Sequence, residues 1–214
     1  MADIITIPVF PLPIVVFPNE ELRLHIFEPR YKQLIQDCKE TGIIFGILTI
    51  YDNRLMEDGC LVKLIEISKL YEDGRMDVRL QSLEKFRKIH FIDHYNNKLY
   101  SGAEITTFDE SEKGTEELYL KTKILFDELC SINKVQPYRS VKWLDYKSYD
   151  IGHFVGFNIH QEYSFFALAT EDERLEYLII QLEFMIEHSR LRANWIKQIH
   201  MNGEFREFKS SEWK

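Results

Sequence analysis

The spacing of the hydrophobic residues changes once along the chain, near residue 108, and this change limits the fold more than any other feature. Before it, β-branched and aromatic residues recur in short runs separated by turn residues, which is typical of strands. From Asp109 the chain becomes acidic, and its apolar residues recur at helical spacing. The sequence therefore predicts an α+β protein in three parts: strands over residues 1–108, helices over 109–208 and a frayed tail over 209–214.

One helix is expected inside the strand-rich part. Residues 22–27 alternate like a half-buried strand, and Pro29 follows where a helix can begin, because its missing N–H costs nothing in the first turn. Gly42 is placed to end this helix. Its expected apolar stripe is Tyr31, Leu34, Ile35 and Cys38.

Further strands are expected after this helix. Residues 72–75 carry a hairpin signal in which Gly74 can take the positive φ that such a turn requires. The strands are predicted at residues 43–51, 61–71, 76–83, 86–92 and 101–108. With those before the helix, about six or seven strands are expected.

Two long helices are predicted in the second part. The first ends near Asn133, and the last begins at a capping box formed by Thr170 and Glu173. The last helix is expected to reach about His200 and to stop at Asn202-Gly203. The predicted apolar stripes are Leu118, Leu125, Leu129 and Ile132 in the first, and Leu175, Leu178, Ile179, Leu182, Met185 and Ile186 in the last.

Less regular structure is expected between these two helices. Residues 137–147, which include Trp143, are predicted to form an irregular connection. Residues 148–169 are predicted to hold one or two shorter helices.

The composition excludes several classes of protein. With 27 basic and 35 acidic residues the net charge is −8, which opposes phosphate binding, so no nucleic-acid partner is expected. Cys38, Cys60 and Cys130 are far apart and form no C-x-x-C pair, which argues against disulfides and a thiolate zinc site. The chain lacks the features of a signal peptide and any apolar run near the ~18 residues of a membrane span. A cytoplasmic protein without a membrane partner is expected.

Three sequence pieces near the N-terminus, in this order and spacing, resemble the Lon protease N-terminal domain, also called the LON substrate-binding domain. They are Ile7-Pro8-Val9-Phe10-Pro11-Leu12, Val16-Phe17-Pro18-Asn19 and Leu24-His25-Ile26-Phe27-Glu28-Pro29-Arg30-Tyr31. Weaker similarity continues in Phe45-Gly46-Ile47-Leu48, Asp73-Gly74-Arg75, Leu83-Glu84-Lys85-Phe86-Arg87, Arg174-Leu175-Glu176 and Asn202-Gly203-Glu204-Phe205. The resemblance spans roughly residues 3–208. Asn19 and Ser82 stand where glycine is common in the family, and Asn19 still tolerates a left-handed turn.

The resemblance implies a PUA-like β-barrel with an inserted helix, followed by a C-terminal helical bundle. In Lon proteases this module helps to recognise unfolded or tagged substrates. A full-length Lon enzyme also carries an ATPase and a serine-lysine protease module, for which 214 residues leave no room. We therefore expect a stand-alone relative.

No catalytic, cofactor or metal site is predicted. The sequence has no G-x-x-x-x-G-K-[ST] loop for ATP and no Gly-Pro-Ser-Ala-Gly-type turn of a Lon protease. Lys147 and Ser148 are adjacent, so on one helix they point in different directions and do not form a dyad. His90 and His94 are four residues apart, but His90 falls in a predicted strand and no H-E-x-x-H is present.

Structural roles are favoured for the polar residues of the strongest motif. His25 is expected to bond to the backbone on the face of the barrel. Glu28 complements the dipole of the following helix, and Arg30 is expected to pair with a neighbouring acid or the backbone. Tyr31 is expected to pack into the barrel.

The segment at residues 10–18 is too apolar for an ordinary solvated loop, and its three prolines keep it from pairing as a central strand. Two interpretations remain open. Ile14, Val15 and Phe17 line an exposed groove for an apolar peptide, or the segment folds back over the end of the barrel.

We interpret the chain as a non-catalytic module that binds unfolded or apolar polypeptide segments, as an adaptor in protein quality control. An RNA-binding PUA-like protein is the alternative, because basic residues lie near Phe86 and Phe91, although acids are interleaved with them. A hydrolase with an unrecognised site is a third. Helix contacts or the apolar segment could support a homodimer. The basic residues are Arg75, Arg79, Lys85, Arg87 and Lys88.

Overall fold

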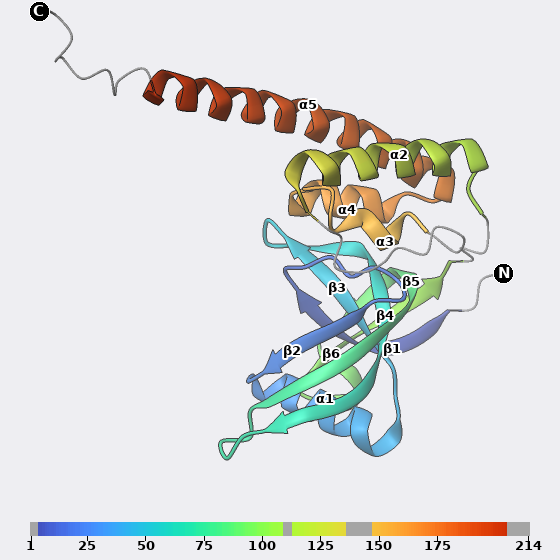
Figure 1. Cartoon of the computed structure of the whole chain (residues 1–214). Coiled ribbons are helices and arrows are strands. Elements are labelled where there is room, and N and C mark those ends of the chain that lie inside the picture. The colour runs from blue at the N-terminus through green and yellow to red at the C-terminus, as the bar shows by residue number, and fades with distance from the viewer. Residues whose placement is uncertain (1–3, 109–112, 136–146, 205–214) are drawn as a thin grey trace, which may run out of the picture. The chain divides into compact units, whose positions relative to one another are not determined.

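A computed structural model describes residues 4–108, 113–135 and 147–204 (Figure 1). The chain divides into two compact units. The first unit comprises Met1–Glu112 with Asn158–Leu168, and the second comprises Lys113–Phe157 with Ala169–Lys214. The predicted connection around Trp143 and the predicted tail lie outside the described residues, apart from Lys147. No helix in the described part is long and apolar enough to cross a membrane.

The first unit is built on a mixed sheet of six strands in the order β2-β5-β4-β3-β1-β6. Strand β5 also pairs with β6, so five of the strands close into a ring. β1 and β3 pair in parallel, with Val9 opposite Gly46, and the other pairs are antiparallel. The strands are β1 (Ile5–Leu12), β2 (Glu21–Ile26), β3 (Phe45–Tyr51), β4 (Arg54–Leu70), β5 (Met76–Ile92) and β6 (Ser101–Thr107).

Strand β5 makes ring closure possible because it is 17 residues long. Its first half pairs with both β2 and β4, whereas Phe86 to Ile92 pairs with β6. The strands predicted at residues 76–83 and 86–92 are therefore one strand, and the break predicted between them is wrong. Register shifts against β4 and β6 accommodate the bend, as bulges do in other sheets.

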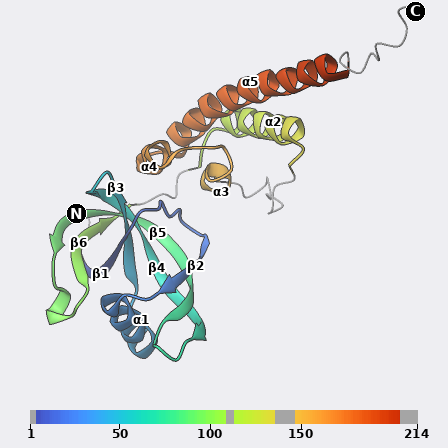
Figure 2. The ribbon, with the colours of Figure 1, turned by 90° about the vertical axis from the view of Figure 1, so that its left-hand side faces the viewer.

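Two helices of the first unit accompany the sheet. Helix α1 (Pro29–Thr41) lies beside β4 (Figure 2) and ends at Gly42, whose φ is 72°. The predicted stripe of Tyr31, Leu34, Ile35 and Cys38 is its buried side. Helix α4 (Ile159–Ala167) begins at a capping box between Asn158 and Gln161, and its contacts place it with the sheet although it lies within the predicted helical subdomain. A 3₁₀ turn, η1 (Tyr95–Asn97), precedes β6.

The second unit consists of α2 (Glu116–Asn133), α3 (Tyr149–Gly152) and α5 (Glu171–Glu204). The capping box predicted before α5 is present: the Glu173 N–H donates to Thr170 Oγ1, and the Thr170 N–H donates to the Glu173 carboxylate. Helix α5 is described as far as Glu204 and runs through Asn202-Gly203, so the stop predicted there is wrong. Its predicted stripe is buried apart from the half-buried Met185. The α+β class, with a strand-rich part and a C-terminal helical part, is confirmed, and the barrel takes the form of a strand ring.

The core of the ring surrounds Phe86. Its neighbours include two glycines on adjacent strands: a Cβ at Gly46 would lie 2.6 Å from Phe86 Cζ, and one at Gly59 would lie 2.7 Å from the same atom. Both positions therefore need glycine because the Phe86 ring occupies the space. The buried cluster comprises Ile7, Val9, Leu48, Leu61, Phe86, Ala103 and Ile105.

We predict that Gly59→Ala destabilises the protein by about 2 kcal/mol, because the added methyl group overpacks this core. It would meet both Phe86 and the carbonyl oxygen of Ile47, which as backbone cannot move aside easily. Urea denaturation measures the effect, with Lys63→Ala, at an exposed position of the same strand, as control. Equal free energies of unfolding for the two variants would contradict the packing argument.

Candidate functional site

The apolar segment at residues 10–18 is the candidate site. Its first residues form the end of β1 and pair with β3, with Pro11 opposite Leu48, so the prediction that its prolines prevent such pairing is wrong for this part. The three predicted site residues differ in exposure. Ile14 is 37% exposed, whereas Val15 and Phe17 are 3% and 1% exposed. Ile14 thus faces solvent, and Val15 and Phe17 belong to the interior of the first unit. Peptide binding at these residues stays a prediction, while the observed burial agrees with a segment that folds back over the sheet.

Hydrogen bonds fix the backbone of this segment. Thr49 Oγ1 donates to the Ile14 carbonyl at 2.9 Å. Ser82 Oγ donates to the Phe17 carbonyl at 2.7 Å and also accepts from the Glu20 N–H at 2.7 Å. Ser82 therefore ties β5 to the segment. The turn after Phe17 uses Asn19 at a φ of 67°, as the sequence predicts.

Helix α4 packs against the same segment. The ring centroid of Phe17 lies 5.4 Å from that of Phe165 in an edge-on arrangement and 6.1 Å from that of Phe166. Both phenylalanines are buried. Sequence analysis did not single out these two residues. The available signal was two adjacent phenylalanines in a helix that Asn158 can cap.

A buried charge network connects α4 to the sheet. Asp58 and Lys85 are both 1% exposed, with 3.9 Å between Lys85 Nζ and Asp58 Oδ2. Arg87 donates two hydrogen bonds to the Asp58 carboxylate, at 2.7 and 2.9 Å. Lys85 Nζ also donates to the Leu168 carbonyl just after α4, at 3.0 Å. The Asp58 N–H donates to the Tyr163 hydroxyl at 3.0 Å. Buried charges need such partners because their desolvation is costly.

Three of the five residues of the predicted basic cluster bond to carboxylates. Arg79 is bonded to Glu21 and Glu66, Arg87 to Asp58, and Arg75 to Asp73. Lys85 is buried. These cations are thus engaged within the first unit.

Removal of the Asp58 carboxylate should cost about 3 kcal/mol, because Asp58→Ala leaves the Lys85 ammonium buried without that counter-charge. Glu57, the residue before Asp58, is exposed and provides the matched control. Glu57→Ala should change the free energy of unfolding by less than about 0.5 kcal/mol. Denaturant titration of both variants compares them. If Asp58→Ala is as stable as the control, the network does not stabilise the fold.

His25 has a partner other than the one predicted. Its Nδ1 lies 2.6 Å from Oδ1 of Asp77 on the paired strand, so the expected backbone bond is wrong. The Tyr71 hydroxyl donates to the other carboxylate oxygen at 2.8 Å. The hydrogen bond from His25, followed by that from Tyr71, lowers the pKa of Asp77.

This lowered pKa predicts a pH dependence of stability. A carboxyl with a lower pKa in the folded state stabilises the protein above its unfolded pKa, about 3.9, and the contribution is lost as the pH falls through the folded value. Between about pH 5 and about pH 3 the free energy of unfolding should therefore fall more steeply for the wild type than for Asp77→Asn. Urea titrations across this range test it, with Glu72→Gln at an exposed hairpin residue as control. Parallel curves for wild type and Asp77→Asn would contradict the prediction.

Arg30 and Tyr31 have the structural roles predicted for them. Arg30 forms an ion pair with Glu28 at 2.8 Å and lies over the Tyr31 ring. The Tyr31 ring stacks on Phe10 with 3.6 Å between centroids. This stack joins α1 to β1 at the first residue of the apolar segment.

Two candidate nucleophiles, Ser148 and Cys38, are engaged or buried. Ser148 Oγ donates to Glu171 at 2.8 Å and accepts from Arg174 at 3.1 Å, in a buried cluster of the second unit. Burial raises the pKa of the Cys38 thiol to about 12, which keeps it protonated, and burial also raises the pKa of Cys130. Ser148 thus has a structural role beside α5.

The ring, its helices and the folded-back segment define the fold of a Lon N-terminal domain. The crystal structure of a Lon N-terminal domain protein from Xanthomonas campestris is similar with a TM-score of 0.64 and 22% identity, over 82% of this chain and 98% of that one. The N-terminal domain of Mycobacterium avium complex Lon protease gives 0.65 and 12%, over 83% and 98%. A model of the ATP-dependent protease La (LON) substrate-binding domain matches residues 6–183. The chain belongs to this substrate-binding domain family.

Proposed function

We propose that this protein is a non-catalytic module that binds unfolded or apolar polypeptide segments. The family match over residues 6–183 supports a role in binding protein substrates. Within the first unit, the segment at residues 10–18 carries the binding surface. Ile14 contacts the bound polypeptide, while Val15 and Phe17 anchor the segment in the interior of the first unit.

The observation that carries this assignment is the fixed backbone beneath an exposed apolar side chain. Thr49 bonds to the carbonyl of Ile14 itself, and Ser82 bonds to that of Phe17. The prolines at 11, 13 and 18 restrict the same backbone further. A rigid apolar surface loses little conformational entropy on binding, so such a surface suits peptides of many sequences.

We further propose that the protein acts in the cytoplasm as an adaptor in protein quality control. The engaged Ser148 hydroxyl and the buried Cys38 thiol support a role without peptide-bond chemistry. Casein incubated with the purified protein, with and without ATP, should remain intact on gels. Casein fragments that vanish when one serine or cysteine is substituted would overturn this part of the proposal.

The binding role predicts a specific effect of Ile14→Ser. Loss of its exposed apolar surface should weaken binding of an unfolded polypeptide about three- to tenfold, from about 25 cal/mol per Å² of apolar surface no longer buried. Fluorescence anisotropy with a labelled, reduced and alkylated protein measures the affinity. The matched control is Leu70→Ser, at an exposed residue at the end of β4 in the same unit. Equal affinities for both variants would contradict the assignment of Ile14.

A further inference from the structure

Helix α5 carries a row of apolar side chains on the surface of the second unit. Ile180, Phe184, Leu191 and Trp195 are 68%, 52%, 54% and 69% exposed. We call these four residues the outer stripe. Their helical spacing places them on the opposite side of α5 from its core. The core side chains are Leu175, Leu178, Ile179, Leu182 and Ile186.

The last part of α5 runs on beyond its neighbour α2 (Figure 1). The ion pair of Glu128 with Arg190 and the hydrogen bond of Asn133 to Ser189 join α5 to the last turns of α2. Every residue from 190 to 199 is exposed. A helical stretch of about ten residues without tertiary packing is only marginally stable in water. Its exposed apolar side chains are therefore expected to pack against another surface. The family match ends at residue 183, so most of this surface lies outside it.

We propose that a second copy of this chain covers the outer stripe, with the two α5 helices antiparallel. The stripe is symmetric about the midpoint between Glu187 and His188. In an antiparallel pair centred there, Ile180 of one copy lies level with Trp195 of the other, and Phe184 lies level with Leu191. Every member of the stripe then meets an apolar partner.

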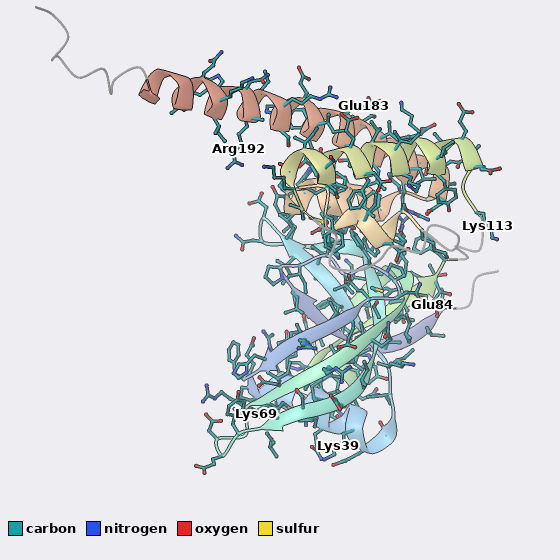
Figure 3. All side chains as sticks on the ribbon, viewed as in Figure 1. Lys39, Lys69, Glu84, Lys113, Glu183 and Arg192 are labelled. Carbon is teal, nitrogen blue, oxygen red and sulfur yellow. The ribbon has the colours of Figure 1, made fainter. Side chains whose placement is uncertain are left out.

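The charges along α5 favour this orientation. Up to Glu187 the helix carries six acidic residues and one arginine, whereas from His188 onward it carries Arg190, Arg192, Lys197 and one acid, Glu204. Antiparallel pairing sets the acidic half of each copy against the basic half of the other, while parallel pairing would align like charges. Glu183 and Arg192, labelled in Figure 3, mark the two halves.

A groove beside the stripe can receive a side chain from the second copy. It lies between α2 and α5, has a volume of about 340 Å³, and its lining includes Leu125, Ile186 and Leu191. Phe184 of the second copy lies level with Leu191 and is placed to enter it.

The exposed apolar area indicates how tight the pairing is. The four stripe residues and Ile199 expose about 600 Å² per copy, from typical areas of such side chains. Two copies would thus bury about 1,200 Å², the lower end for a specific interface. A reversible dimer with a dissociation constant on the order of micromolar follows.

Sedimentation velocity of the full chain, from about 1 to about 100 µM, tests association. The wild type should pass from monomer to dimer, and the double variant Phe184→Glu with Leu191→Glu should stay monomeric. Leu120→Glu with Ile124→Glu is the matched control, because both residues are exposed on α2, and it should dimerise like the wild type. Circular dichroism checks that both double variants are folded. A monomeric wild type throughout the range, or equal loss of dimer in both double variants, would overturn the proposal.

Cysteine cross-linking tests the orientation. In a Cys130→Ser background, mixed Phe184→Cys and Leu191→Cys proteins should form a disulfide between the two variants under mild oxidation. Each variant alone should cross-link far less. Efficient self-cross-linking of Phe184→Cys would indicate a parallel pair and contradict the antiparallel arrangement. If the wild type stays monomeric and the stripe variants weaken binding of unfolded polypeptide, the stripe binds substrate and the proposal is wrong.

Discussion

The pairing of β5 with three other strands is the constraint on which the first unit depends. A closed ring removes the exposed edges of its strands, and closure requires one strand long enough and bent enough to pair on both sides. β5 meets this requirement through its length and its register shifts. Three of its buried residues also organise the candidate site. Ser82 holds the apolar segment, Lys85 bonds to the end of α4, and Phe86 fills the ring.

The position of the apolar segment follows from this arrangement, because the segment is attached to the sheet and to α4. Its backbone bonds to β3 and β5, and its Phe17 packs on α4. To expose Phe17, the chain would have to break these hydrogen bonds and leave the Phe17 carbonyl without its Ser82 donor, which is costly for a buried group. In the proposed binding role, only outward side chains of the segment such as Ile14 can contact a polypeptide, while the buried residues hold its backbone in place.

Features that depend on neighbours in the sequence could be predicted. The buried stripe of α1, the left-handed Gly42 after it, and the capping box of Thr170 and Glu173 all follow from spacing within one or two turns of helix. The exposure of the site residues could not be predicted, because it depends on partners far along the chain. Phe17 meets Phe165 across most of the sequence. No local pattern reports such a contact.

The side-chain partners of single polar residues could not be predicted from the sequence either. The alternation of β2 placed His25 on a strand face, but not opposite Asp77, because strand register depends on the whole sheet. The mixed-charge pattern of its strand predicts that Lys85 is one of several surface cations, yet Lys85 is buried. A lysine is rarely buried without a counter-charge, and the counter-charge here lies on another strand.

Helix α5 has two apolar faces, which one neighbour cannot cover. Leu178 and Leu182 are buried in the second unit, while Phe184 and Leu191 lie on the other side of the helix. Apolar residues on both sides are typical of a helix enclosed within a larger core. Here the first face is enclosed within one chain, and the second extends past the end of α2, where the chain offers it no described cover. The reversal of charge near residue 188 then has a physical consequence. It makes one end of α5 electrostatically complementary to the other, and two separate copies can use that complementarity only when their helices run in opposite directions.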